Sequence, residues 1–233
     1  MKKIAIIPAR GGSKRIPKKN IKSFLGKPII AYSILAALES GLYDEVMVTT
    51  DCDEIAETAV KYGARTPFIR SRKNSSDVAT TVDVLVEVLN WYRDCENTKF
   101  DLGTCIYACA PFVNSVLLNQ SVILLEQRNA DCVFPAVAYS HPIQRAFEMK
   151  GSGNIVPFTE GDSEGRTQDL AKTYHDAGMF YTFQVEKLIT TKSLRTSETF
   201  AIAISELQAQ DIDTPEDWFL AEMKYRLFGN EKL

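Results

Sequence analysis

The stretch IIPARGGSKRIPKKN, residues 6–20, gives the strongest indication of the fold. It starts within a short apolar run, residues 4–9, whose branched side chains are typical of a buried parallel strand. Gly11 and Gly12 follow, and glycines allow a sharp backbone turn that points N–H groups at an anion. Open α/β folds bind ligands at the carboxyl edge of the sheet. The stretch therefore predicts an α/β protein with a polyphosphate site at the end of its first strand.

Positive charge is concentrated within this stretch. The cations are Arg10, Lys14, Arg15, Lys18 and Lys19. Like charges this close repel one another unless an anionic partner neutralises them. The phosphate-loop spacings G-x-x-x-x-G-K-[ST] and G-x-G-x-x-G are both absent, and Pro17 disfavours helical geometry at Ile16. We therefore expect an extended loop that holds phosphate with side chains as well as backbone. The alternative is a solvated basic turn.

Composition fits a single globular domain, residues 1–233. Hydrophobic residues make up 45% of the chain and charged residues 24%, and the formal net charge of −3 disfavours a nucleic-acid partner. The five cysteines include no C-x-x-C pair, so neither a disulfide framework nor a zinc site is indicated. We find no run long enough to span a membrane and no signal peptide, so we expect a cytoplasmic protein with no membrane partner.

Strand-like and helix-like patterns alternate through the first half, which is typical of βαβ units and a mainly parallel sheet. The expected strands are residues 4–9, 45–50, 102–108 and 132–138. The expected helices are residues 28–40, 53–62, 80–92 and 115–127. Two more strands are expected at 179–183 and 200–204, followed by a terminal helix with Thr214 as N-cap and Pro215 at its first position.

Residues 139–176 interrupt this alternation. They are rich in Gly, Ser, Pro, Thr and charge, and their apolar runs are short. Long loops without structure of their own are uncommon in compact domains unless they serve a function. We therefore expect an inserted arm that covers a substrate or reaches another subunit.

Asp211 and Asp213 precede the terminal helix. In an extended segment, a spacing of two places both carboxylates on one side, with Ile212 facing the core. Magnesium favours a few carboxylates together with substrate phosphate oxygens, so this pair complements the basic loop if the fold joins them. The alternative is that Asp213 only begins the helix and Asp211 faces water. Asp51, at a strand end, suits ribose, metal or a helix cap.

Polar residues also cluster at the end of the arm. Arg166 can bind a carboxylate through two parallel hydrogen bonds, and Gln168 and Tyr174 can hydrogen-bond hydroxyls. Gly178 allows a ligand to approach the backbone closely. The alternative is a surface loop with incidental polar residues.

These motifs together resemble the acylneuraminate cytidylyltransferases, the CMP-sialic acid synthetase family. Besides residues 6–20, the resemblance rests on GKP at 26–28, TTD at 49–51, RTQDL at 166–170 and QDIDTPEDW at 210–218, in the family's order. HPIQRA at 141–146 and YHDAGMFY at 174–181 look most like the branch that activates pseudaminic acid.

The resemblance implies a nucleotide-diphospho-sugar transferase type of Rossmann-like fold, with a mixed, mainly parallel sheet flanked by helices and a homodimer built through the arm. It implies that CTP and a nonulosonic acid react to give the CMP-sugar and pyrophosphate. By similarity, CTP would contact Arg10, Ser13, Lys14, Lys19 and Asn20 beside Gly11 and Gly12. The catalytic residues would be Lys19 on the triphosphate and Asp211 and Asp213 on Mg²⁺. The sugar acid would contact Arg166, Gln168, Tyr174, Gly178, Phe180 and Tyr181, in part across the dimer.

Departures from the family pattern fall in the sugar half. Residues 107–109 read Tyr-Ala-Cys where the sialic branch usually has Gln-Pro-Thr, Ala177 replaces an Asn, and Met179 stands where the pseudaminic branch has Gln. The CTP and metal motifs are intact. The alternatives are a CMP-sialic or CMP-legionaminic acid synthetase, a deoxyoctulosonate enzyme, a related glycosyltransferase, or a nucleotide sensor without catalysis.

Overall fold

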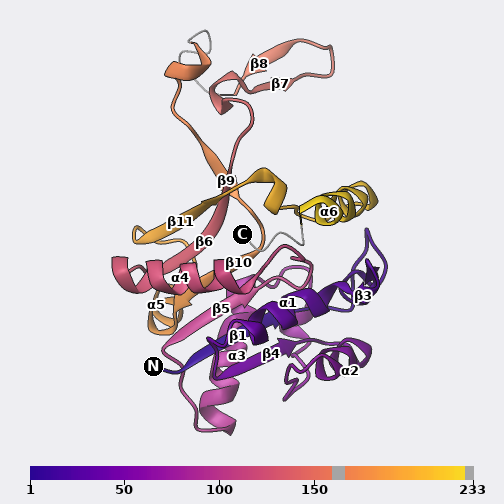
Figure 1. The fold of residues 1–233 in the computed structure, drawn as a ribbon, viewed down its shortest axis with the longest axis vertical. Helices are drawn as coiled ribbons and strands as arrows, with labels where there is room; N and C mark the ends of the chain where they lie inside the picture. The colour runs from indigo at the N-terminus through magenta and orange to yellow at the C-terminus, as the bar shows by residue number, and fades with distance from the viewer. Residues whose placement is uncertain (159–165, 229–233) are drawn as a thin grey trace.

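A seven-stranded mixed sheet organises the computed structural model, which describes residues 1–158 and 166–228 (Figure 1). The path of the sheet is β11-β6-β10-β5-β1-β4, and β9 pairs with β6 beside it. The strands are β1 (Lys3–Pro8), β4 (Glu45–Thr49), β5 (Leu102–Ile106), β6 (Cys132–Ala138), β9 (Tyr174–Asp176), β10 (Phe180–Gln184) and β11 (Thr199–Ile204).

Strand direction in this sheet is mainly parallel, as expected. β1 runs parallel to both β4 and β5, and β11 runs parallel to β6. β10 is the exception on the path, because it pairs antiparallel with β5 on one side and β6 on the other. The carboxyl ends of β1, β5 and β6 therefore share one edge of the sheet with the beginning of β10.

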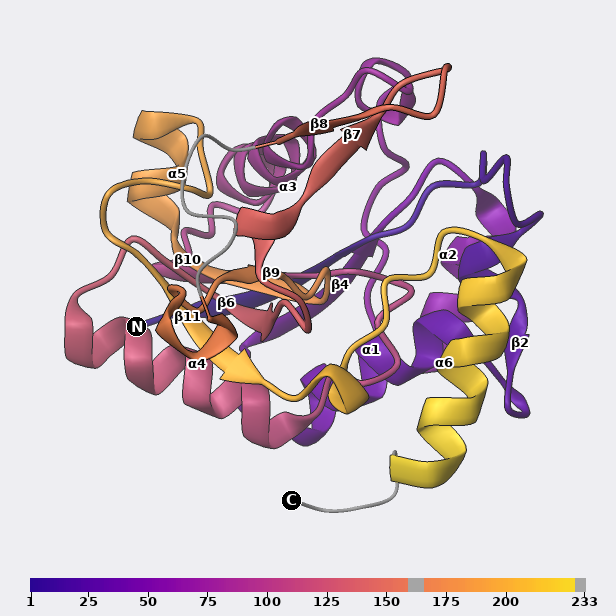
Figure 2. The ribbon, with the colours of Figure 1, turned by 90° about the horizontal axis from the view of Figure 1, so that it is seen from above.

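Helices cover both faces of the sheet (Figure 2). They are α1 (Ile29–Glu39), α2 (Asp53–Lys61), α3 (Thr81–Cys95), α4 (Ser115–Arg128), α5 (Val185–Thr191) and α6 (Pro215–Phe228). Alternate β1 residues face opposite ways, so Ala5 and Ile7 pack with α1 and α4, whereas Ile4 and Ile6 pack with α3 and α5. None of the helices among the described residues has both the length and the apolarity to cross a membrane.

The expected strands and helices of the first half are all present, with ends shifted by a few residues. α3 is the clearest case, because the Thr80 hydroxyl accepts a hydrogen bond from the Asp83 N–H and the Asp83 carboxylate accepts one from the Thr80 N–H. The short helix α5 was not expected. Its seven residues, VEKLITT, follow β10 directly and mix branched residues with charge, which gives little helical pattern.

The described part of the polar segment before β9, residues 139–158 and 166–173, projects away from the sheet (Figure 1). It contains a small hairpin of β7 (Phe147–Met149) and β8 (Ile155–Pro157), and it returns to the sheet through β9. The chain therefore leaves and rejoins the sheet at the edge where β6 ends and β10 begins. A second small hairpin, β2 (Ser23–Phe24) with β3 (Lys27–Pro28), leads into α1.

Candidate active site

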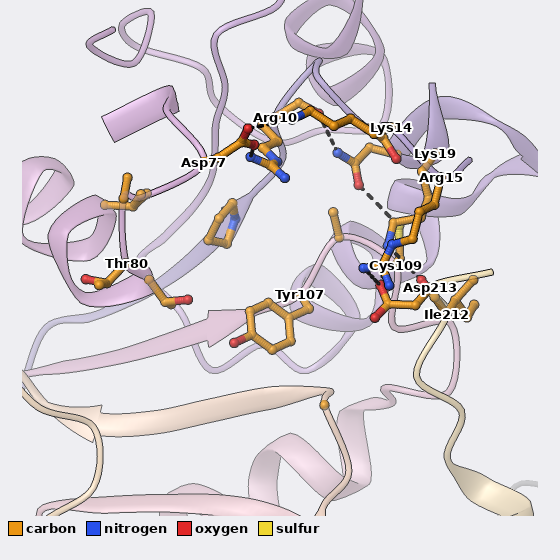
Figure 3. Close-up of a pocket in the computed structure, with 18 of the residues that line it drawn as sticks. Arg10, Lys14, Arg15, Lys19, Asp77, Thr80, Tyr107, Cys109, Ile212 and Asp213 are labelled. Carbon is orange, nitrogen blue, oxygen red and sulfur yellow. Dashed lines mark hydrogen bonds and ion pairs between the residues drawn. The ribbon is translucent and has the colours of Figure 1, made fainter. Parts of the chain in front are cut away.

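A cavity of about 620 Å³ opens at the shared edge of the sheet, where β1 and β5 end (Figure 3). Pro8 and Tyr107 line it from the strand ends, Thr80 and Thr81 from the start of α3, and residues 211–213 from the segment before α6. The two ends of the chain thus meet at the position where open α/β sheets bind ligands.

Most of the basic loop faces this cavity. Its lining includes Arg10, Ser13, Lys14, Arg15, Lys19 and Asn20. Lys18 points elsewhere and pairs with Glu54 at 2.6 Å. As expected, the loop stays irregular until a short 3₁₀ turn, Lys19–Ile21. Four of the cations that line the cavity therefore come from this one loop.

The glycine pair has a different role from the expected one. The Gly11 N–H donates to Asp51 Oδ1 at 2.8 Å, so this amide is paired with a carboxylate of the protein and is not available to a phosphate. A Cβ on Gly11 would lie 3.0 Å from the Cys52 Cβ, a tight contact that glycine avoids. Gly11 and Gly12 do not line the cavity. Asp51 is not a helix cap either, because Cys52 is the N-cap of α2 and makes no side-chain hydrogen bond there.

The basic loop and the aspartate pair are in direct contact. Lys19 Nζ donates to the carbonyl oxygen of Ile212 at 2.6 Å and lies 3.5 Å from Asp213 Oδ1. Arg15 Nη2 lies 2.8 Å from the same oxygen. The Ile212 side chain is buried, while Asp211 and Asp213 both line the cavity. The alternating orientation expected from a spacing of two is present.

Asp217 fixes the segment that carries the aspartate pair. Its carboxylate accepts hydrogen bonds from the N–H groups of Asp213 and Thr214, and the Thr214 hydroxyl accepts one from the Asp217 N–H. The first turn of α6 is therefore capped by Thr214 and Asp217, as expected for Thr214. The alternative in which Asp213 only begins the helix is wrong, and its carboxylate is left for the cavity.

The aspartate pair fits a divalent cation. Packing around Asp211, together with the nearby Asp213 charge, raises the pKa of the Asp211 carboxyl, while Lys19 opposes this shift. Two negative groups held close together in this way are suited to a counter-ion. Among residues 1–158 and 166–228, no group of three or more His, Cys, Asp or Glu side chains could hold a metal. An ion at this pair would need substrate and water oxygens as further ligands, which is the usual coordination of Mg²⁺.

Gly178 lies against this pair from the start of β10. Its φ of +66° is a left-handed conformation, and a Cβ there would lie 3.5 Å from the Asp211 Cγ. Glycine therefore lets the chain enter β10 beside the aspartate pair, and Gly178 lines the cavity.

Asn20 is held by two neighbours. Its Nδ2 donates to the carbonyl oxygen of Arg10 at 2.8 Å, and its Oδ1 accepts from the Cys109 thiol at 3.2 Å. Burial raises the pKa of Cys109 to about 12, so the thiol keeps its proton and can donate. A hydrogen-bond donor is thus retained where the sialic branch would place Thr.

A second cavity, of about 360 Å³, adjoins the first. The two share Thr80, Thr81 and Tyr107. The remaining lining of the second cavity includes Tyr181, Lys192 and Arg195. The rings of Tyr107 and Tyr181 meet edge to face with centroids 5.9 Å apart.

Asp176 links the two cavities. Its carboxylate accepts hydrogen bonds from the Gly178 N–H at 2.8 Å, from Arg195 Nη2 at 2.8 Å and from the Tyr181 hydroxyl. One acidic side chain therefore fixes a residue of the first cavity and two residues of the second.

The residues predicted for the sugar acid are dispersed. Tyr181 lines the second cavity, but Phe180 is fully buried on the other face of the sheet, because neighbouring strand residues point in opposite directions. Arg166, Gln168 and Tyr174 are described by the structure and line neither cavity of their own chain. Arg166 and Gln168 lie on the projecting segment, whereas Tyr174 begins β9 and pairs with Ala138 of β6.

Sequence reasoning missed Asp77 and Arg70, which both line the first cavity. Asp77 lies in the polar loop before α3, and nothing in its spacing marks it. Arg70 is buried and donates to the carbonyl oxygen of Thr49 at 3.1 Å. Burial lowers the pKa of Arg70, which the Asp51 charge partly offsets. The sequence did contain one sign of this part of the cavity lining. The capping box of Thr80 and Asp83 marks the start of α3, and Thr80 and Thr81 line the cavity there.

Known proteins resemble this chain over nearly its whole length. Residues 4–178 match the model of the cytidylyltransferase family. A pseudaminic acid cytidylyltransferase from Campylobacter jejuni is 39% identical, and the alignment covers 97% of each chain. A CMP-N,N'-diacetyllegionaminic acid synthase from Legionella pneumophila is 30% identical, with 95% of each chain covered. The solved structure of a CMP:2-keto-3-deoxy-manno-octonic acid synthetase complexed with CTP shares the fold, with a TM-score of 0.68, 19% identity and coverage of 97% of this chain and 98% of that one.

Proposed function

Since this chain belongs to the cytidylyltransferase family, we propose that it joins CTP to a nonulosonic acid, pseudaminic acid in particular, and releases pyrophosphate. The observation that carries the proposal is the contact of Lys19 with the 211–213 segment, which brings four cationic side chains of the basic loop and the two carboxylates of this segment into one cavity. The relatives named above support the substrate class, and pseudaminic acid is the acceptor in the name of the 39% identical relative.

The reaction requires little covalent chemistry from the protein. The anomeric hydroxyl oxygen of the acceptor attacks the α-phosphorus of CTP, the bond to the bridging oxygen breaks in line, and pyrophosphate leaves with the electron pair. The hydroxyl proton passes to solvent. Arg10, Lys14 and Lys19 would hold the polyphosphate and neutralise the charge that develops on the leaving group.

Asp211 and Asp213 are the residues that would hold Mg²⁺. When bound, this ion would supply positive charge at the α-phosphate and lower the pKa of the attacking hydroxyl. Asp217 would keep the Asp213 backbone in place, and Lys19 would keep the pair beside the phosphate loop. Gly178 would leave room on the acceptor side of Asp211.

The second cavity is the place for the acceptor in this proposal. It joins the first at Tyr107, which follows β5, so an acceptor there would reach the nucleotide across the shared wall. Lys192 and Arg195 give this cavity a positive side that suits a sugar carboxylate. Arg166 and Gln168 lie too far along the projecting segment for their own chain's cavity, so in this proposal they serve the partner subunit of a homodimer.

Exposed apolar side chains on the hairpin support such a dimer. They are Phe147, Met149, Ile155 and Val156, and Phe158 follows at 76% exposure. Apolar groups that project together on one segment are typical of an interface. The proposed occupant is the same segment of a second copy of the chain.

Pyrophosphate release with CTP and magnesium, measured against pseudaminic, legionaminic, sialic and deoxyoctulosonic acids, tests the proposed function. We expect the highest kcat/KM with pseudaminic acid. Activity with sialic acid alone would overturn the proposed acceptor and keep the cytidylyl transfer. Release of a nucleotide would indicate a glycosyltransferase, and tight CTP binding without turnover over the whole panel would indicate a sensor.

A further inference from the structure

Two cations of the phosphate loop are already paired with an acid. Arg10 Nη1 lies 2.6 Å from Asp77 Oδ1, and Lys14 Nζ lies 2.7 Å from Asp77 Oδ2. Asp77 comes from the loop before α3 and lies beside Arg10 of the basic loop (Figure 3). Each carboxylate oxygen of Asp77 is thus paired with a cation that the proposed function assigns to the triphosphate.

Asp77 differs from the other acid that pairs with this loop. Asp213 contacts Arg15 and Lys19, but it also belongs to the pair suited to a cation. Figure 3 shows Asp77 and Asp213 at opposite ends of the row of basic side chains. The described residues contain no group of three metal-binding side chains, so Asp77 does not complete a metal site with the aspartate pair.

Both ion pairs of Asp77 are formed by exposed side chains and are therefore weak. The side chains of Arg10, Lys14 and Asp77 are 43%, 78% and 57% exposed. Hydrogen bonds from Lys14 and, to a smaller extent, from Arg10 hold the pKa of Asp77 below its usual range, so the carboxylate is ionised at neutral pH. Exposed ion pairs contribute little free energy, and a polyphosphate brings more charge and more acceptor oxygens to the same cations.

We propose that Asp77 is an anionic stand-in for the polyphosphate: it pairs with Arg10 and Lys14 in the free enzyme, is displaced when the nucleotide binds, and pairs with them again as pyrophosphate leaves. The inference rests on the proposed function for the identity of the departing group. As a consequence, free pyrophosphate should bind more weakly and leave more easily, because the Asp77 carboxylate competes with it for Arg10 and Lys14.

Calorimetric binding of inorganic pyrophosphate and of CTP, each with magnesium, tests this proposal on the Asp77→Asn variant. Removing the competing charge should increase the affinity for pyrophosphate and for CTP by about three- to tenfold, the factor expected for the loss of two exposed ion pairs. Pyrophosphate should also inhibit turnover at a correspondingly lower concentration. The gain should shrink in high salt, because screening weakens exposed charges.

Glu54→Gln is the matched control. Glu54 pairs with Lys18 of the same loop at 2.6 Å, but neither residue lines the cavity. This variant removes one negative charge near the loop without freeing a cavity cation, so its affinities should stay at the wild-type values. Tightening of the same size in Glu54→Gln would reduce the effect to net charge and overturn the proposal.

Unchanged or weaker binding by Asp77→Asn would overturn the stand-in role, and weaker binding would make Asp77 a residue that orients the loop. A second variant, Asp77→Ser, should behave like Asp77→Asn, since either change removes the charge at an exposed position. Unchanged affinities with normal cytidylyl transfer would overturn this inference alone. Tighter affinities with no transfer to any sugar acid would support it and overturn the proposed function.

Discussion

Lys19 and Ile212 lie 193 positions apart, and the Lys19 ammonium donates to the Ile212 carbonyl oxygen at 2.6 Å. This bond uses a backbone acceptor between two carboxylates, so the ammonium can keep its place while Asp213 exchanges partners. It positions one cation at the boundary between the phosphate loop and the proposed metal pair.

Lys19→Ala should weaken CTP binding and slow the chemical step, with kcat/KM reduced by about two orders of magnitude or more. The reason is that both the leaving pyrophosphate and the aspartate segment lose the same cation. Lys18→Ala is the adjacent control, because Lys18 faces Glu54 outside the cavity. Steady-state kinetics with varied CTP measure both variants. Equal kinetics for Lys19→Ala and wild type would remove Lys19 from the site.

Asp213→Ala should lower turnover by about two orders of magnitude or more at limiting magnesium, with the fold retained. The aspartate pair would keep a single carboxylate, and Arg15 would lose its partner. Glu216→Gln, an exposed acid in the next turn, should leave the magnesium dependence unchanged. Magnesium titrations of activity, with circular dichroism as the folding control, decide the assignment. Near-normal activity of Asp213→Ala at low magnesium would defeat it.

Cys109 offers a matched pair of substitutions of nearly equal size. Cys109→Thr should keep CTP affinity, because a hydroxyl can still donate to Asn20 Oδ1. Cys109→Val should weaken CTP binding by about three- to tenfold, because the amide oxygen of Asn20 loses its donor. Binding isotherms measure both. Identical affinities for Thr and Val would show that the bond to Asn20 does not matter for the nucleotide.

Thiol alkylation at pH 8 should distinguish the cysteines by their pKa values. Burial raises the pKa of Cys109 and of Cys132 to about 12, so both remain protonated at pH 8 and should react slowly. Cys95 is exposed and should react first. Raising the pH toward 10 should increase the thiolate fraction of the buried thiols and speed their labelling while the fold persists. Mass spectrometry of native protein measures each site, and early labelling of Cys109 at pH 8 would contradict its buried environment.

The proposed dimer predicts that Met149→Glu, at a side chain 68% exposed on the hairpin, shifts the protein from dimer to monomer. The new charge would be buried without a partner at the interface. Val116→Glu is the control, because Val116 is 50% exposed on α4, away from the projecting segment. Light scattering after size exclusion measures the mass. A wild-type monomer at micromolar concentration would overturn the proposed assembly.

The strand and helix order could be predicted from the sequence because it depends on local periodicity and on end signals such as Thr80 and Thr214. The shared side on which the Asp211 and Asp213 carboxylates lie could also be predicted, since a spacing of two in an extended segment is enough. Phe180 and Tyr181 show the limit of motif reasoning. Both belong to one motif, but the alternation of a strand allows only one of them to face the second cavity.

Other features depend on contacts that no local pattern encodes. The Gly11 amide is held by Asp51, 40 positions away, and glycine at this position avoids a tight contact with Cys52. Asp77 reaches Arg10 from 67 positions away, out of a loop whose sequence looks like an ordinary polar turn. Such pairings arise where the segments that follow β1 and β4 and the loop before α3 meet in the folded chain, and they become visible only there.

The antiparallel direction of β10 has a consequence for how this fold can change over time. Because β6 ends and β10 begins at the same edge of the sheet, the chain between them is inserted at the edge where the first cavity opens. Insertions and deletions there would change the segment that the proposed dimer brings to the partner's acceptor cavity, and they would leave β1, the basic loop and the 211–213 segment untouched. The architecture thus separates a fixed nucleotide half from an exchangeable sugar half, so new acceptors can be acquired without rebuilding the transfer machinery.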